Sequence, residues 1–304
     1  MTFSDYNFNL PSLERALDRN PITVSPDTLL ADAIAMMGSV NNSEVEETLF
    51  AVPDEGLTSA RKNTTCVVVM EADQILGVFT QRDAVRTVAS GTIDQQQVKI
   101  TQVMTKPAIA LKIAEAQDIF TPLLFFRQHN IHHLPILDCN DGKLLGIITP
   151  KDILQTLQPH NLFKLGTVGE VMNTQLVYAS RTSSLLSIAQ IMVEQKVSCV
   201  VITDERENKV EEVQLKTHSF PIGIITEEKI LQALTLGRNL ANTPAFRAMR
   251  CLGYQLNPAH SLLTAYQQML ECNGDTLLVF NDRQDSNEAK LGIITEIELL
   301  RSLE

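Results

Sequence analysis

A short sequence motif, here called the phrase, occurs four times in this chain of 304 residues, at 76–83, 145–152, 222–229 and 291–298, and each copy ends on a charged residue. Each copy runs from Leu or Ile through Gly and an apolar pair to Thr, and three residues later it ends on Asp83, Asp152, Lys229 or Glu298. Thr followed three residues later by a carboxylate, before an apolar helix, is typical of a capping box that satisfies free amides of the helix start. A carboxylate also offers acceptor oxygens to a ligand, whereas an ammonium offers none. The last residue of the phrase is therefore where we look for function.

The phrase also predicts how the chain is organised. Gly77 and Gly223 are 146 residues apart, and so are Gly146 and Gly292, so the natural unit is a pair of repeats used twice. Each repeat is expected to fold as strand, helix, strand, strand, helix, with the glycine in a turn and the threonine as a helix cap. A unit of roughly 60 residues buries too little surface to be stable alone, so two units are expected to pack sheet to sheet around a shared core.

The second repeat shows this order most clearly. We predict strands at 108–111, 133–137 and 144–148, a helix at 119–126, a last helix capped by Thr149 and ending at Leu157, and a hairpin turn in which Gly142 supplies positive φ. In the other repeats we predict strands at 22–25, 66–70, 176–179, 199–203, 221–225, 276–280 and 290–294 and helices at 29–37, 184–194 and 262–271. Polar insertions fall at 38–63 and 204–219, a linker covers 158–167, and a short amphipathic helix is expected at 10–17.

Composition narrows the class of protein. The net charge of −11 argues against nucleic acid or a phospholipid surface as a general partner. The chain has no apolar run of about 20 residues and no signal-peptide pattern at its start, so we expect a cytoplasmic protein with no membrane partner. Its five cysteines are odd in number and lack CxxC spacing, which indicates reduced thiols. Phosphate-loop and nucleophile-elbow motifs are absent, so we expect no enzymatic activity and no catalytic residues.

The repeated order, with its Gly-apolar-apolar-Thr-x-x-Asp ending, resembles the CBS domain, a family named after cystathionine β-synthase. Two such domains side by side resemble a Bateman module, and the resemblance covers the chain from Pro21 onward. It implies an α/β (α+β) fold of four βαββα repeats, at 21–90, 101–158, 168–236 and 247–304, after an N-terminal extension at 1–20. The repeats are expected to pair as module 21–158 and module 168–304.

A looser similarity concerns the two ends of the chain. The opening stretch 6–14 and the closing stretch 298–304 are similar to the N-terminal sensory part of cyanobacterial multi-sensor signalling proteins. In those proteins, paired CBS modules precede PAS, kinase or diguanylate cyclase domains. The resemblance therefore implies a possible downstream signalling domain, although a free-standing regulator fits equally well.

The family resemblance assigns roles to the threonine and to the final residue of the phrase. It implies that Asp83 and Asp152 accept hydrogen bonds from the two hydroxyls of a ribose, and that Thr80 and Thr149 contact ribose or phosphate. For Lys229 and Glu298 we favour helix capping over ligand binding. Arg82 and Lys151 add positive charge beside two helix N-termini that favour a phosphate, and a solvated helix face is the equally weighted alternative.

Two further groups of residues complete the predicted site. His132 and His133 occupy the place of the family's phosphate-binding pair, and His133 is expected to be partly charged at pH 7. We rank phosphate contact above a metal for this pair, because adjacent strand residues point to opposite faces. By family analogy adenine packs against the first strand of a repeat, at Ile22–Thr23 and Ala108–Ile109.

The sequence thus predicts a non-catalytic sensor. The first pair of repeats is expected to bind an adenine nucleotide (AMP, ADP or ATP) in the cleft between its two repeats, with no cofactor or metal required. The second pair is expected to transmit the state or to form a homodimer. One alternative is a ligand-free dimerisation scaffold in which every phrase is only a cap. Another is the input half of a kinase or cyclase that responds to a different adenosyl ligand.

Overall fold

The computed structural model describes residues 13–38, 65–91, 97–116, 118–157, 166–205, 219–251, 256–272, 274–280 and 291–302. Most of the two predicted insertions, most of the predicted linker and the first residues of the predicted N-terminal helix lie outside these ranges. Within them, that helix is a short 3-10 helix, η2 (Leu13–Arg15), and its Leu13 packs into the core.

The first two repeats have the predicted order of elements. Repeat 1 contains β1 (Thr23–Val24), α1 (Leu30–Gly38), β2 (Cys66–Glu71), β3 (Gln74–Thr80) and α2 (Gln81–Ala89). After η3 (Ile100–Gln102), repeat 2 contains β4 (Leu111–Lys112), η4 (Ile113–Glu115), α3 (Phe120–His129), β5 (Leu134–Leu137), β6 (Leu144–Ile148) and α4 (Pro150–Thr156). The first strand of each repeat lies parallel to the second, and the second and third strands form a hairpin. Gly142 has the predicted positive φ in the hairpin turn.

The last two repeats keep this order. Repeat 3 contains α6 (Val168–Val171), β7 (Tyr178–Ser180), α7 (Leu185–Gln195), β8 (Cys199–Glu205), β9 (Ser219–Thr226) and α8 (Glu227–Thr235). After η5 (Ala245–Arg247) and β10 (Arg250–Cys251), repeat 4 contains α9 (Leu262–Glu271), β11 (Thr276–Phe280), β12 (Leu291–Thr295) and α10 (Glu296–Arg301). A single parallel bridge, from Leu256 to Val279, takes the place of the first strand of repeat 4.

The segment before each first strand pairs with the sheet of the other repeat in its pair; we call it the edge segment. Thr105, which precedes β4, bridges to Val78 of repeat 1, and Asp18, which precedes β1, bridges to Ile147 of repeat 2. In the second pair Asn173 bridges to Ile293, and Arg250 of β10 pairs with Ile224 of β9. The two sheets of a pair are therefore joined by reciprocal edge segments.

The edge segment corrects the predicted strand at 108–111. Thr105 still belongs to the edge of the first sheet, whereas Leu111 pairs with Ile136 of the second. The residues between them cross from one sheet to the other, so the strand begins only at Leu111.

The edge segment also corrects the role of the repeated glycine, which lies in a strand and not in a turn. A Cβ on Gly77 would approach the Thr105 carbonyl oxygen to 2.6 Å, and a Cβ on Gly146 would approach the Asp18 carbonyl oxygen to 2.2 Å. Gly is needed there because the edge segment comes close to the strand.

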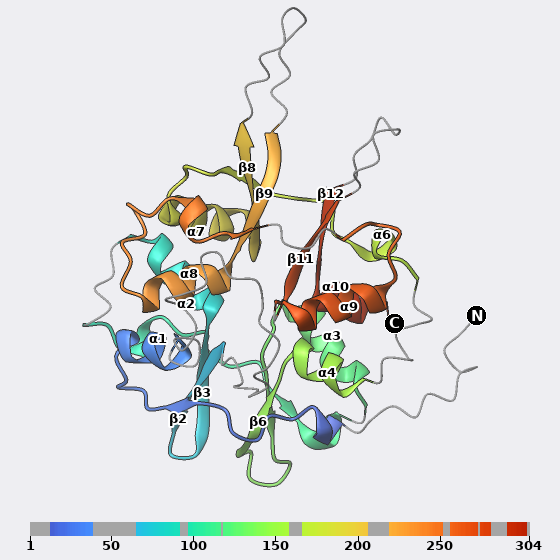
Figure 1. Ribbon diagram of the computed structural model, residues 1–304. Helices are drawn as coiled ribbons and strands as arrows, with labels where there is room; N and C mark the ends of the chain where they lie inside the picture. Colours follow the sequence, from blue (N-terminus) through green and yellow to red (C-terminus); the bar gives the residue numbers. More distant parts are fainter. Residues whose placement is uncertain are drawn as a thin grey trace, which may run out of the picture.

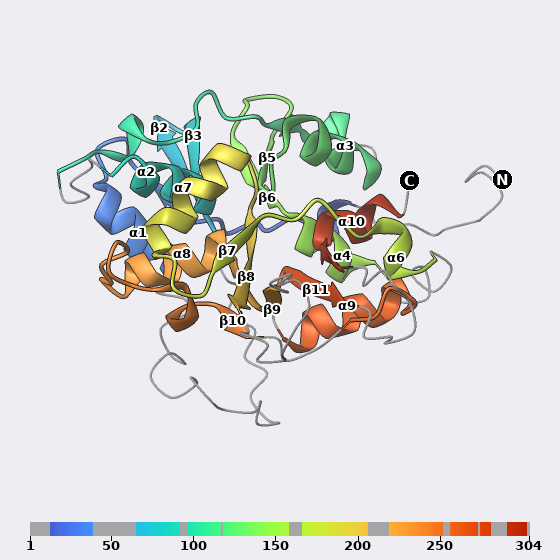
Figure 2. The same cartoon turned by 90° about the horizontal axis from the view of Figure 1, so that it is seen from above.

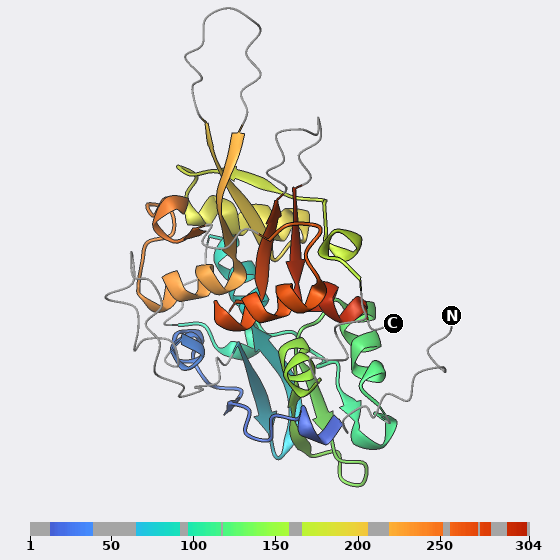
Figure 3. The same cartoon turned by 45° about the vertical axis from the view of Figure 1, so that its right-hand side comes forward.

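The sheet and the helices of each repeat pack against different neighbouring repeats. The β2–β3 hairpin packs on the β5–β6 hairpin through Cys66, Val68, Val78 and Ile147, and the β8–β9 hairpin packs on the β11–β12 hairpin (Figure 3). The helices instead join different pairs: α2 packs against α7 and α8, α1 against α8, and α4 against α10 (Figures 1 and 2). Each repeat therefore contacts one neighbour through its sheet and another through its helices. None of the helices in the described ranges is both long and apolar enough to cross a membrane.

Candidate functional site: the capping turns and the central cavity

Three of the four repeated phrases form the predicted capping box. The Asp83 carboxylate accepts bonds from Thr80 N and Thr80 Oγ1, both at 2.9 Å. Asp152 Oδ2 accepts from Thr149 N at 3.0 Å and from its Oγ1 at 2.7 Å. Glu298 likewise accepts from the backbone and the hydroxyl of Thr295. Capping by Glu298, which we favoured from the sequence, is confirmed.

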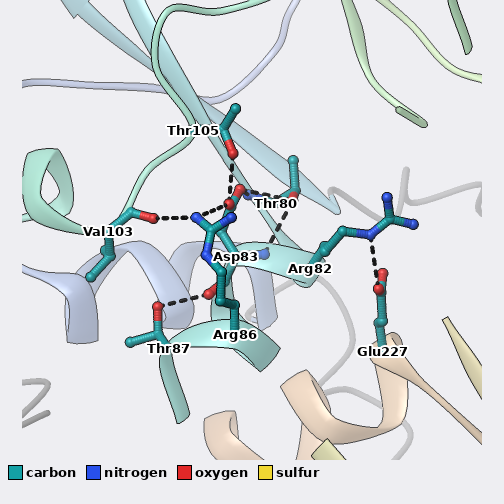
Figure 4. A network of polar contacts seen from close by, with 8 residues as sticks. All are labelled: Thr80, Arg82, Asp83, Arg86, Thr87, Val103, Thr105 and Glu227. Carbon is teal, nitrogen blue, oxygen red and sulfur yellow. Dashed lines mark hydrogen bonds and ion pairs between the residues drawn. The ribbon is translucent and has the colours of Figure 1, made fainter. Parts of the chain in front are cut away.

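Asp83 has further partners that the sequence analysis missed (Figure 4). Its Oδ1 accepts a bond from Thr105 Oγ1 and an ion-pair bond from Arg86 Nη2, both at 2.7 Å. Together with the two bonds from Thr80, these use the roughly four acceptor positions of a carboxylate. Asp83 is only 2% exposed, so in this structure it ties α2 to the edge segment of repeat 2.

The surroundings of Asp152 are different, and its side chain is half-buried. In repeat 2 the place of Thr105 is taken by Asp18, whose carboxylate cannot donate a hydrogen bond. The place of Arg86 is taken by Gln155, which is neutral and exposed. The threonine hydroxyl and the guanidinium that bond Asp83 therefore have no counterpart at these two places in repeat 2.

The third phrase departs from the prediction that every threonine caps its helix. Thr226 occupies the N-cap position of α8, but its side chain makes no capping hydrogen bond. Lys229, in the place of the carboxylate, donates to Gln232 Oε1 at 3.0 Å. The Thr226 hydroxyl is buried and has no hydrogen-bond partner among the described residues, because an ammonium cannot accept its proton.

Two of the predicted phosphate contacts, Arg82 and His133, bond to protein partners. The Arg82 Nε donates to Glu227 Oε1 at 3.1 Å, and its Nη1 donates to the Asn130 carbonyl at 2.6 Å, so Arg82 joins repeats 1, 2 and 3. His133 Nε2 bonds to the hydroxyl of Thr65, while His132 lines the cavity described below.

The expected partial charge on His133 is wrong for this structure. Burial lowers the pKa of His132 to about 4 and that of His133 to about 3, and the nearby Arg82 acts in the same direction. Both rings are neutral at pH 7, so neither supplies positive charge for a phosphate.

The predicted adenine contacts are spread over the first module. Ile22 packs against the repeat 1 core, and the neighbouring Thr23 is exposed. Ala108 packs between the two sheets, whereas Ile109 packs against the large core shared by repeats 2 and 4. Neither Ala108 nor Ile109 lies in the first strand, for the reason given above.

A central cavity of about 50 Å³ lies where the four repeats meet. The first residues of α2, α4, α8 and α10 all line it, so the helix N-termini converge there. The lining residues are Gln81, His132, Pro150, Ser198, Thr226, Glu227, Asp275, Thr276, Thr295, Glu296 and Ile297.

Comparison with known proteins identifies the family. The model of the CBS domain matches residues 13–90, 100–159 and 168–236, more than half of the chain. The chain belongs to the CBS domain family. The matched segments correspond to CBS repeats 1 to 3, and 247–304 has the same order of elements.

Archaeal proteins are among its relatives. Protein MK0525 of Methanopyrus kandleri is 36% identical over 89 residues, which are 29% of this chain and 44% of that protein. Protein MJ1225 of Methanocaldococcus jannaschii is 25% identical over 177 residues, 54% of this chain and 56% of that protein. The matches thus span about half the length of these curated relatives.

Two solved structures share the whole architecture. The crystal structure of MJ1225 covers 97% of this chain and 100% of that chain, with a TM-score of 0.72 and 18% identity. A structure from Pyrococcus horikoshii covers 96% and 99%, with a TM-score of 0.55 and 13% identity. At these identities the likeness concerns the fold, here an arrangement of CBS repeats.

Three carboxylic acid residues, Glu227, Asp275 and Glu296, line the cavity between the CBS repeats. Burial raises the pKa of Glu296 to about 8, and Asp275 adds to the shift while Lys151 opposes it. Burial also raises the pKa of Glu227, against the effect of its ion pair with Arg82. Both shifts favour the protonated, neutral form of the carboxyl group, so these two residues add less negative charge to the cavity than ionised carboxylates would.

The sequence analysis missed Asp275, although a signal for it exists. Thr276 pairs with Thr295 as Cys66 pairs with Thr80, so Asp275 occupies in CBS repeat 4 the place of His132 in repeat 2. Its Oδ1 is buried and has no hydrogen-bond partner among the described residues. Aligning all four repeats at this position would have placed Asp275 at the centre.

Proposed function

We propose that this chain is a non-catalytic regulatory module that binds an adenine nucleotide, AMP, ADP or ATP, in the cleft of the first CBS pair. The observation that carries the proposal is the convergence of all four helix N-termini on one centre. A ligand bound at one capping turn lies near elements of both pairs and can favour one arrangement of them over another. MJ1225, whose fold matches over the full length, is described as a proposed archaeal homologue of γ-AMPK, which agrees with a regulatory role.

Within this proposal the ribose lies beside Asp152 rather than Asp83. The Asp152 side chain is half-buried and thus reachable, whereas Asp83 is enclosed by Thr105 and Arg86. Two ribose hydroxyls donating to a carboxylate form charge-assisted hydrogen bonds. Thr149 and Lys151, on the same turn, are the proposed neighbours of the ribose and phosphate.

Calorimetry of the full chain with AMP, ADP, ATP, S-adenosylmethionine and cyclic dinucleotides tests the proposal. Asp152→Asn should weaken the binding of the adenine nucleotide by about tenfold or more, because it removes the charge from the proposed acceptor. Glu298→Gln is the matched control, since it makes the same change in a capping box with no proposed ligand. Equal affinities in wild type and Asp152→Asn would reject the ribose position, and no binding of any adenosine compound would reject the function.

One observation favours a second candidate, a ligand-free scaffold: Asp83, one of the two predicted ribose acceptors, is fully engaged by protein donors. Under this alternative the phrases serve only to cap helices and to hold the repeats together. A homodimer in light scattering, combined with no thermal stabilisation by any adenosine compound, would support the scaffold. The homodimer itself stays a prediction.

A further inference from the structure

The hydrophobic cores of this chain join repeats of different pairs. One continuous core extends through repeats 2 and 4 and includes Leu123 of α3 and Leu263 of α9. The cores of repeats 1 and 3 interlock, because Val85 of α2 packs in the core of repeat 3 and Leu231 of α8 packs in the core of repeat 1. We call repeats 1 and 3 the first half and repeats 2 and 4 the second half, each with the edge segments that pair with its sheets.

Between the halves, the buried residues form small clusters that are separate from these cores. The cluster between the sheets of repeats 1 and 2 has four buried residues, Cys66, Val68, Val78 and Ile147. The cluster between the sheets of repeats 3 and 4 also has four, Cys199, Val201, Ile224 and Leu278. Since a packed core resists separation in proportion to the apolar area it buries, the chain should yield at these two clusters before it yields within a half.

The chain passes between the halves in short connections. Residues 19–22 lead from Asp18, on the sheet of repeat 2, to β1, and residues 106–110 lead from Thr105, on the sheet of repeat 1, to β4. Residues 174–177 lead in the same way from Asn173, on the sheet of repeat 4, to β7. A few residues at the ends of elements are sufficient to absorb the backbone rotation of a hinge movement.

The proposed nucleotide requires such a movement. Pockets for small molecules usually measure about 300–1,000 Å³, whereas the central cavity measures about 50 Å³. Across the cleft of the first pair, Arg82 Nη1 donates to the Asn130 carbonyl at 2.6 Å, and the His133 ring bonds to the Thr65 hydroxyl. The structure is therefore the closed arrangement, and a ligand must move repeat 1 away from repeat 2.

We propose that the chain responds to its ligand as two rigid halves, so that a nucleotide that separates repeats 1 and 2 also separates repeats 3 and 4. The inference rests on the nucleotide site proposed above and assigns how binding there is transmitted. Repeat 3 moves with repeat 1 because their cores interlock, and repeat 4 moves with repeat 2 because they share one core. The two clefts are then coupled, and the coupling acts equally in both directions.

Adjacent residues of β8, in the second pair, provide a test and its matched control. Val201 is 1% exposed and packs between the sheets of repeats 3 and 4, whereas Val200 is 0% exposed and packs in the core of repeat 3. Val201→Ala weakens only the closed arrangement, so it should raise the affinity for the adenine nucleotide by about threefold or more in calorimetry. Val200→Ala should leave that affinity unchanged.

If Val201→Ala does not fold, the same comparison is made on β11 with smaller changes. Leu278→Val alters the cluster between the sheets and should raise the affinity, and Leu277→Val alters the core of the second half and should not. Nucleotide binding that is equal in wild type and in the sheet-facing variant, or that rises equally in the control, would overturn the movement of two halves and leave the nucleotide site intact.

Hydrogen exchange of the ligand-free chain tests the halves without any nucleotide. Leu231→Ala should speed amide exchange in β2 and β3 of repeat 1 by about tenfold or more, because Leu231 fills the core of that repeat. The amides of β11 and β12, in the other repeat of its own pair, should keep their wild-type protection. Equal acceleration in repeats 1 and 4, or acceleration in repeat 4 alone, would refute the two halves. If no adenosine compound binds, the proposed function is rejected, and this exchange result decides whether the halves exist.

Discussion

Replacing Asp83 by alanine should destabilise the protein more than the same change at any other capping box. The substitution leaves three part-buried donors without their acceptor: Thr80 N, Thr80 Oγ1 and Thr105 Oγ1. Each such group costs about 1–3 kcal/mol, and since neighbouring effects are not additive we expect a total loss of about 3–5 kcal/mol. Arg86 adds little, because its side chain is 52% exposed and returns to water.

Glu298→Ala provides the comparison, because it removes the acceptor of Thr295 N and Thr295 Oγ1 and a 4.0 Å ion pair with the exposed Arg301. We expect a loss of about 1–3 kcal/mol there, so Asp83→Ala should cost about 2 kcal/mol more. The measurement is urea denaturation followed by circular dichroism, with the free energy of unfolding extrapolated to water. Equal losses, or a larger loss for Glu298→Ala, would show that the bond to Thr105 contributes nothing and would refute the proposed tie between the repeats.

Three further predictions concern local features of the fold. Gly77→Ala should lower the free energy of unfolding by about 2 kcal/mol or more, because its Cβ would come within 2.6 Å of a backbone oxygen; an unchanged denaturation midpoint would contradict this. Below about pH 6.5 the unfolded chain takes up protons that His132 and His133, whose pKa values are lowered in the folded chain, do not bind there. The free energy of unfolding should therefore fall by up to about 1.4 kcal/mol per pH unit for each ring until its folded pKa is reached. Replacing both by Gln should remove that slope in denaturation measured across pH. Lys229→Gln should stabilise the protein by about 0.5–1 kcal/mol, because Gln can complete the capping box with Thr226; a lower melting temperature would argue against it.

Local features were predictable because their causes lie within a few residues. The helix at 262–271 and the strand at 276–280 have the predicted bounds, since their apolar patterns and flanking polar residues are sufficient to define them. The strand predicted at 108–111 was misplaced because the crossing between two sheets cannot be inferred from an apolar pattern alone. The cap predicted at Thr226 failed because Lys229 lacks an acceptor, a consequence that the sequence already contained.

The candidate site was less predictable for a physical reason. His132 and His133 lose their charge through burial, and the pKa shift depends on the atoms that surround them in the folded chain. The partners of Asp83 come from an edge segment 22 residues away and from the following helical turn. Asp275 reaches the centre only because repeat 4 packs beside repeat 3.

The sequence by itself determined the repeated unit. Four similar phrases specify four hairpins followed by helices, and three capping boxes, because hairpin pairing and helix capping are short-range interactions. The tertiary structure decided which repeats meet through their helices, since that depends on apolar faces contributed by residues far apart in the chain. Because of this packing, the predicted ribose acceptor Asp83 instead links two repeats through hydrogen bonds, and acidic residues from two repeats line one cavity. Burial and charge at that centre are properties of the assembled fold, so no single repeat could reveal them.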